Sequence, residues 1–350
     1  MVVVGADVHK RTHTFVAVDE VGKELGHKTF PATTPGHQDA VRWARRRFGR
    51  DLVWAIEDCR HLSARLERDL LGAGGSVVRV PPKMMAEQRR VARTRGKSDP
   101  IDALAVARAA QREPDLPVAS HDEASRELKL LVDRRDDLVK HRTSTINRLL
   151  WHVHEIDPEL APPKASLGRA VRQQQLADGL AGRSGIVAEL ARDELADVVE
   201  LTQRINDLER RITPLVEQAA PTLLTVPGVG ALTAAKLVGE TAGVARFKSE
   251  AAFARHAGIA PIPVWSGNTH GRVRLTRSGN RQLNAADHRI AVTQIRLDGL
   301  GKRYYEKKKA EGMSPRSPAL PQAPTRSRRL HPPDHRPSSV RGWTRDRRLT

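Results

Sequence analysis

The hydrophobic and polar positions of the first 115 residues follow two periods in turn. Short apolar runs rich in β-branched residues predict strands at residues 2–8, 13–19, 24–30, 51–56 and 76–80. Apolar positions spaced three and four apart predict helices at about 36–48, through Leu62, Leu66 and Leu70, and after Asp99. The predicted elements follow the order of three strands, a helix, a strand, a helix, a strand and a helix. This is the element order of a ribonuclease-H-like α/β domain.

From about Ser125 the pattern becomes helical and highly charged. Residues 125–156 predict one long helix, which is followed by a proline-bearing break at 158–163. Apolar residues then recur three and four apart in a heptad pattern, at Val198, Leu201, Ile205, Leu208, Ile212 and Leu215. An antiparallel hairpin, a dimer contact and a helix packed on its own domain all fit this pattern.

A third region begins near Pro221. The run Leu224–Gly230, followed by the small residues of Thr233–Leu237, has the signature of a helix-hairpin-helix. In that motif Gly228 and Gly230 would expose backbone N–H groups to a DNA phosphate at a helix N-terminus. A plain turn between two helices is the alternative interpretation.

Composition narrows the class of partner. The formal net charge of +19 indicates a polyanion, most simply nucleic acid. No apolar run reaches membrane-spanning length, and the chain start lacks the basic segment of a secretory signal, so a cytoplasmic protein is expected. Cys59 is the sole cysteine, which excludes an intrachain disulfide. Aromatic residues are 3% of the chain, which leaves few platforms for stacked bases.

The stretch from Lys97 to Leu104 carries two carboxylates on one face of a predicted helix start. Pro100 suits the first helical position, Asp99 can cap the helix, and Asp102 follows three residues later. These acids also suit a helix dipole without any catalytic role. In a ribonuclease-H-like fold, however, they would meet Asp7 on the first strand and Glu57 at the end of its neighbour. Four converging carboxylates predict a Mg²⁺ or Mn²⁺ site suited to phosphoryl transfer.

Two groups of cations accompany these acids. The first is expected to contact phosphate beside the acidic cleft, at Arg89, Arg90, Arg93, Arg95 and Lys97. The second follows a proline-bounded loop with Ser266 before Gly267, at Arg272, Arg274, Arg277 and Arg281. Guanidinium groups there would hold a scissile phosphate. A Ser-Gly pair alone is most often a turn.

Taken together, these motifs resemble the insertion sequence 110 family of DEDD (Asp-Glu-Asp-Asp) transposases, which are bridge-RNA-guided recombinases. The resemblance spans about residues 2–314 and rests on the four acids, Val226–Gly230, Ser266-Gly267 and Gly279–Leu283. It implies three domains: a RuvC-like domain at 1–115, a coiled-coil arm at 120–218 and a transposase domain at 219–314.

The resemblance also implies the chemistry. In such enzymes acids binding Mg²⁺ assist a serine that forms a serine–phosphate intermediate with DNA, and Ser266 is the serine that matches. A non-coding guide RNA and a homodimer or homotetramer are implied as partners. A Holliday-junction-resolving nuclease, which needs no serine, and an inactive nucleic-acid-binding remnant are the alternative functions.

Two departures from the family pattern stand out. Asp287 occupies a helical position where an apolar residue is expected. Residues 315–350 form a basic tail rich in proline and arginine, where the family has a basic helix, and the tail is predicted to be disordered. A frameshift is one account of the tail, since a codon choice exists for which the next reading frame encodes a helical sequence.

Overall fold

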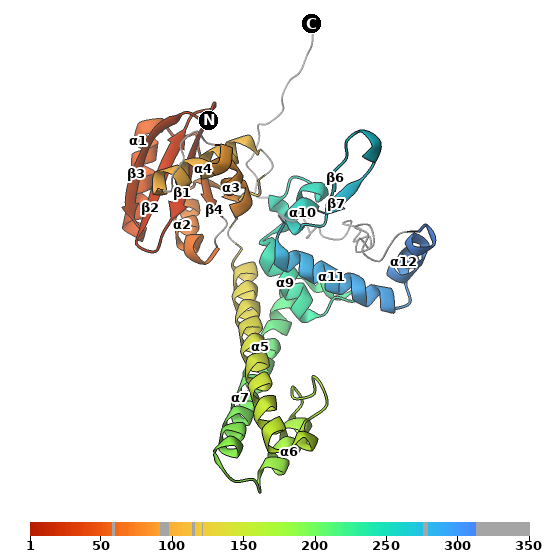
Figure 1. The fold of residues 1–350 in the computed structure, drawn as a ribbon. Coiled ribbons are helices and arrows are strands. Elements are labelled where there is room, and N and C mark those ends of the chain that lie inside the picture. The colour runs from red at the N-terminus through yellow and green to blue at the C-terminus, as the bar shows by residue number, and fades with distance from the viewer. Residues whose placement is uncertain (58–59, 92–97, 114–115, 121, 276–278, 313–350) are drawn as a thin grey trace.

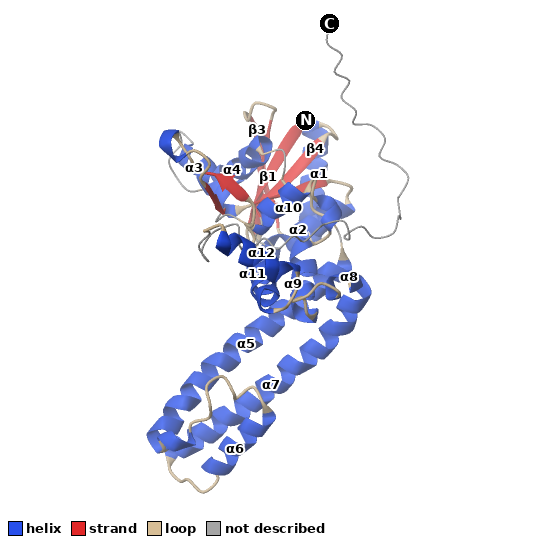
Figure 2. Ribbon diagram, turned by 90° about the vertical axis from the view of Figure 1, so that its right-hand side faces the viewer, coloured by secondary structure: helices blue, strands red, loops and turns tan. Residues whose placement is uncertain are grey.

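The computed structural model describes residues 1–57, 60–91, 98–113, 116–120, 122–275 and 279–312. Figures 1 and 2 show three parts: a sheet covered by helices, a long two-helix arm, and a helical C-terminal region beside the upper end of the arm. The predicted tail lies outside the described residues.

A five-stranded mixed sheet forms the N-terminal part. Its strands are β1 (Val2–Val8), β2 (Thr12–Val18), β3 (Glu24–Pro31), β4 (Leu52–Glu57) and β5 (Ser76–Val80). The spatial order is β3-β2-β1-β4-β5, with β1 antiparallel to β2 and parallel to β4. This is the strand order of a ribonuclease-H-like domain, as the hydrophobic pattern predicted.

Helices cover both faces of this sheet because successive β1 side chains point in opposite directions. Val4, Ala6 and Val8 pack on the side of α1 (Thr34–Phe48) and α2 (Arg60–Gly72). Val3 packs on the opposite side, against α4 (Asp99–Arg112), beside which α3 (Pro82–Val91) lies.

Helix α4 sits directly on β1. A Cβ atom on Gly5 would lie 2.2 Å from the carbonyl oxygen of Ala103, so only glycine allows this approach. The predicted cap was wrong by one residue: Ser98 is the N-cap, and Asp99 is already helical. Ser98 has the extended backbone of a cap, which moves the helix start ahead of Pro100.

The arm consists of α5 (Glu123–Ile156) and α7 (Ile186–Ala219), which pack antiparallel along their length (Figure 2). Leu128 of α5 packs with Ile212 of α7, and Leu149 packs with Val198. The heptad positions therefore form an intrachain hairpin, which was one of the open alternatives.

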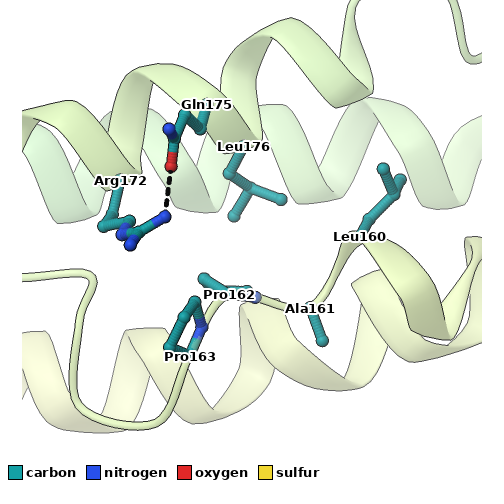
Figure 3. Close-up of a pocket in the computed structure, with 7 residues that line it drawn as sticks. All are labelled: Leu160, Ala161, Pro162, Pro163, Arg172, Gln175 and Leu176. Atoms are coloured by element: carbon teal, nitrogen blue, oxygen red, sulfur yellow. Dashed lines mark hydrogen bonds between the residues drawn. The ribbon is translucent and has the colours of Figure 1, made fainter.

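The far end of the arm carries two further elements, η1 (Pro158–Leu160) and α6 (Ala170–Leu180). A pocket lies between them, lined by Leu160, Ala161, Pro162, Pro163, Arg172, Gln175 and Leu176 (Figure 3). Arg172 there donates a hydrogen bond to the side chain of Gln175. The pocket contains none of the predicted site residues.

The C-terminal region contains mostly short elements. They are α8 (Pro221–Leu224), α9 (Ala231–Thr241), η2 (Val244–Arg246), α10 (Glu250–Ala257), β6 (Pro261–Pro263), η3 (Gly267–Thr269), β7 (Val273–Leu275), α11 (Arg281–Arg296) and α12 (Leu300–Ala310).

Buried ion pairs fasten this region to the arm. Glu240 of α9 accepts a hydrogen bond from Lys129 of α5 at 2.5 Å and one from Asn280, the N-cap of α11, at 2.7 Å. Lys236 of α9 also donates to Asp136 of α5 at 2.5 Å. Because these charges are compensated by partners on another helix, α9 is held in place on the arm. Among the described residues, no helix combines the length and apolar character needed to span a membrane.

Candidate active site

Asp7 lies near the end of β1 on the face covered by α4. Its side chain is only 12% exposed, and its Oδ2 is 3.0 Å from Nε2 of His9. Burial raises the pKa of Asp7 above its ordinary value, the His9 contact opposes this rise, and the nearby carboxylates of Asp102 and Asp99 add to it. The local environment therefore disfavours the charged form of this carboxyl unless a positive charge lies beside it.

Asp99 and Asp102 reach the same place from the first turn of α4. Asp99 is half exposed, and its Oδ1 is 3.4 Å from Nε2 of His9. Asp7, His9 and Asp99 each offer one ligand atom, and these atoms all lie within 4.8 Å of one another. Three charged or polar groups, from β1, the turn that follows it and α4, thus converge at one end of the sheet.

Asp102 is buried one helical turn further along. Its Oδ1 is inaccessible to solvent and receives no hydrogen bond, and the Nε of Arg89 is 3.2 Å away. A buried carboxylate is costly without a cation, so the Arg89 guanidinium compensates its charge in this structure.

Glu57 is the last residue of β4, the strand that runs parallel to β1. Ala6 of β1 is paired with Ile56 of β4, so Glu57 follows at the same edge where Asp7 follows Ala6. The register therefore brings this half-buried residue to the end of the sheet that holds Asp7.

The sequence pattern did not point to His9 as a site residue. It stands two residues after Asp7, and side chains two apart on extended backbone point to the same side. That spacing was the available signal, but a lone histidine after a strand has no metal-ligand pattern of its own.

The first group of predicted phosphate-binding cations is only partly described. Arg89 and Arg90 lie on α3, where Arg89 pairs with Asp102 and Arg90 is exposed. Arg93, Arg95 and Lys97 fall outside the described residues. Arg89 therefore contacts an acid of the cluster, whereas the sequence predicted a contact with phosphate.

The glycine turn before α9 has the backbone that its sequence suggested. Gly228 has a φ of +85°, a left-handed conformation that favours glycine, and Gly230 is the exposed N-cap of α9. The preceding helix α8 has only four residues, and a helix-hairpin-helix assignment remains a prediction.

Ser266 is exposed in the loop that connects β6 with β7. Its backbone N–H donates to the hydroxyl of Thr269 at 3.0 Å, and Thr269 N–H donates back to the Ser266 carbonyl. These reciprocal bonds fix a tight turn, which leaves the serine on an ordered loop at the surface.

The arginines that follow Ser266 are distributed over two elements. Arg272 precedes β7, Arg274 lies within it, and Arg281 begins α11; all three are exposed. Arg277 lies outside the described residues. The exposed guanidinium groups are accessible to a phosphate backbone, whereas their contact with one remains a prediction.

Asp287 occupies an apolar environment on α11, as its unusual position suggested. Its Oδ2 is buried without a hydrogen-bond partner, and burial raises the pKa of this carboxyl to about 6. Its neighbours Leu283, Ala286 and Ile290 are buried. Asp287 therefore stands at a position that suits an apolar side chain.

Two family models match different parts of this sequence. One, the DEDD transposase model of the IS110 type, matches residues 4–158, and another, for transposases of the IS116/IS110/IS902 family, matches residues 220–306. This chain belongs to the IS110 family of transposases. Asp7, His9, Glu57, Asp99 and Asp102 all lie within the first match, and Ser266 lies within the second.

Three curated relatives come from insertion elements of Streptomyces and Mycobacterium. A protein of element IS116 from Streptomyces clavuligerus is 28% identical over 89% of this chain and 88% of the relative. One from IS900 of Mycobacterium paratuberculosis is 26% identical over 75% and 78% of the two chains. One from IS110 of Streptomyces coelicolor is 25% identical over 89% and 88%. The IS110-family transposase described here is therefore similar to these relatives over most of its length.

One solved structure with likeness to this transposase is RuvC of T. thermophilus in complex with a Holliday junction substrate. The identity is 15% and the TM-score 0.28, with 34% of this chain and 99% of that chain covered. A likeness at this score does not bear on function. The ribonuclease-H-like fold is supported instead by the strand order of the sheet.

Proposed function

We propose that this transposase cuts and rejoins DNA through a serine–phosphate intermediate, with Ser266 as nucleophile and Asp7, Glu57, Asp99 and Asp102 as ligands of Mg²⁺ or Mn²⁺. The observation that supports this proposal is that Asp7 of β1 and Asp99 of α4 both lie against His9, while the charge of Asp102 acts on Asp7. Glu57 follows Ile56, the partner of Ala6, at the end of the neighbouring strand.

The donor set fits a hard divalent cation. Carboxylate oxygens are the ligands that Mg²⁺ and Mn²⁺ prefer. The buried Oδ1 of Asp102 accepts no hydrogen bond, and its charge is compensated in this structure by Nε of Arg89 at 3.2 Å, a place that a metal cation would take. When bound, such a cation stabilises negative charge on a reacting phosphate and lowers the pKa of a coordinated hydroxyl.

Ser266 supplies the nucleophile in this proposal. Its Oγ loses a proton and attacks the scissile phosphorus, which forms a serine–phosphate ester and releases the other strand end as a hydroxyl. Attack by a new hydroxyl end on this ester joins the strands and returns the serine. Because a serine hydroxyl is weakly nucleophilic at its ordinary pKa, this scheme needs the acidic site close by.

The acids and the serine belong to different parts of the molecule, which we assign as a RuvC-like domain at 1–115, an arm at 120–218 and a transposase domain at 219–314. A homodimer or homotetramer would bring the acids of one subunit to the serine of another. Between the domain that carries the acids and the domain that carries the serine, one contact within a single chain is Arg255 of α10 with Glu113 at 3.9 Å.

DNA is the proposed substrate, held through its backbone by Arg90, Arg272, Arg274, Arg281 and the Gly228–Gly230 turn. The net charge of +19 with 3% aromatic residues suits a protein that holds backbone while base pairing supplies sequence recognition. A non-coding guide RNA is therefore the proposed source of specificity.

The test of the metal site is strand cleavage of labelled element-end DNA with Mg²⁺, with Mn²⁺ and in EDTA. Asp7→Asn and EDTA are each expected to abolish cleavage, because the converging carboxylates no longer hold a cation. Asp51→Asn is the matched control, since Asp51 is 86% exposed in the same domain. Full cleavage in EDTA, or by Asp7→Asn, would contradict the proposed site.

A further inference from the structure

His9 lies among the proposed metal ligands, and the proposed function gives it no role. Its Nε2 is 3.0 Å from Oδ2 of Asp7 and 3.4 Å from Oδ1 of Asp99. The ring therefore bridges the carboxylates of a strand and a helix.

The chain fixes the position of this ring locally. The backbone N–H of His9 donates to the carbonyl oxygen of Thr12 at 3.1 Å, which closes the turn between β1 and β2. His9 thus continues from β1 with its side chain on the same side as Asp7. Its place beside Asp7 follows from a short hairpin, although the side chain itself is half exposed.

The spacing suits shared coordination of one ion. Neighbouring ligand atoms that each lie about 2.1 Å from one cation are separated by about 3 Å, close to the separations between Nε2 and both carboxylates. A buried carboxylate oxygen of Asp102, which lacks a hydrogen bond, belongs to the same cluster of charge.

We propose that His9 is a nitrogen ligand of the divalent cation that Asp7 and Asp99 hold. This inference rests on the proposed function, and it adds a residue and a selectivity to that site. Because imidazole is a softer ligand than carboxylate and Mn²⁺ accepts it more readily than Mg²⁺, the site should favour Mn²⁺. A simple hydrogen bond from the ring to Asp7 is the competing explanation of the same distances.

Pulsed electron paramagnetic resonance of Mn²⁺ bound to the full chain, prepared without a histidine tag, separates these explanations. A directly coordinated imidazole gives a ¹⁴N modulation of the manganese signal, whereas a ring that only hydrogen-bonds to a carboxylate ligand gives none of that strength. The wild type is expected to show this modulation, and His9→Ala is expected to lose it.

The matched control is His27→Ala. His27 is also half exposed on the same sheet and contacts a carboxylate, with Nδ1 2.7 Å from Glu24, but it lies on β3. This variant should keep the ¹⁴N modulation. Loss of a residue that only supports a metal ligand already weakens metal binding by about 10–100-fold. Loss of a ligand in His9→Ala should therefore weaken Mn²⁺ binding by roughly tenfold or more in calorimetric titration, and Mg²⁺ binding by less.

The failures of the two proposals are distinguishable. If wild-type Mn²⁺ shows no ¹⁴N modulation while Asp7→Asn still weakens Mn²⁺ binding, His9 is not a ligand and the carboxylate site stands. If Asp7→Asn binds Mn²⁺ as the wild type does, or the wild type binds none, the metal site itself is refuted and the role of His9 with it.

Discussion

The close approach of α4 to β1 is predicted to depend on Gly5. In Gly5→Ala the added Cβ would lie 2.2 Å from the Ala103 carbonyl oxygen and 2.5 Å from the Ala107 backbone nitrogen. Both atoms belong to the backbone of α4, so no side chain can rotate away to make room. The helix must move, and Asp99 and Asp102 move with it.

The size of this movement follows from the contacts. Ordinary van der Waals contact begins at 3.4 Å, so the gap between β1 and α4 must open by about 1 Å. Overpacking of this kind costs about 1–3 kcal/mol of stability. A displacement of about 1 Å at a catalytic group can lower a rate by about a hundredfold. Gly5→Ala should therefore remain folded yet cleave DNA far more slowly than its loss of stability explains.

The assay pairs urea unfolding with the strand-cleavage rate measured well below the unfolding midpoint. Gly72→Ala is the control, because a Cβ at this position of α2 would meet no atom within 4 Å. The free energy of unfolding and the cleavage rate of Gly72→Ala should both be close to those of the wild type. A Gly5→Ala protein with wild-type stability and wild-type cleavage would refute the reasoning about how α4 positions its acids.

Two further predictions concern pH. The pKa of Asp287 is about 6 in the folded chain and 3.8 ordinarily, so the protonated carboxyl stabilises the fold at low pH and this stabilisation is lost as pH rises toward 6. The gain in unfolding free energy of Asp287→Asn over the wild type should therefore be about 2 kcal/mol larger at pH 7.5 than at pH 4. An equal gain at both pH values would contradict this. Burial and the neighbouring ring of His37, which stacks on it, lower the pKa of His13 from 6.5 to about 4. The free energy of unfolding should therefore fall by about 2 kcal/mol from pH 7.5 to pH 5 through this residue. In chemical unfolding, His13→Leu should show a pH dependence smaller by that amount, and an unchanged pH dependence would count against this.

The fold of the sheet domain was accessible from sequence because its elements carry strong local patterns. Alternation and β-branched runs located the strands, and their order implied the neighbours of β1. The start of α4 was misplaced because Ser98, Asp99 and Pro100 each suit a helix start, and backbone conformation decided between them. Glu57 required the strand register, which the sequence implied only through the fold.

Other features depended on contacts between distant residues, which local patterns do not contain. The heptad positions allowed three kinds of partner, and only the packing of Leu128 with Ile212 and of Leu149 with Val198 identified an intrachain hairpin. Likewise, the pairing of Arg89 with Asp102 and the bridging position of His9 follow from how α3 and α4 lie on the sheet. Asp287 was the reverse case, since its local pattern alone marked it as out of place.

In the proposed reaction, one serine becomes covalently attached to DNA under the control of the acidic site. Labelled element-end DNA is incubated with the wild type, Ser266→Ala or Asp102→Asn, denatured and resolved on a gel, and the adduct is digested for mass spectrometry. We expect a protein-linked band in the wild type and a DNA remnant on Ser266. We expect no band in Ser266→Ala or Asp102→Asn, although both variants should still bind DNA. A band of equal strength in Ser266→Ala, or cleavage by the wild type without any adduct, would contradict it, the latter favouring a nuclease that uses water.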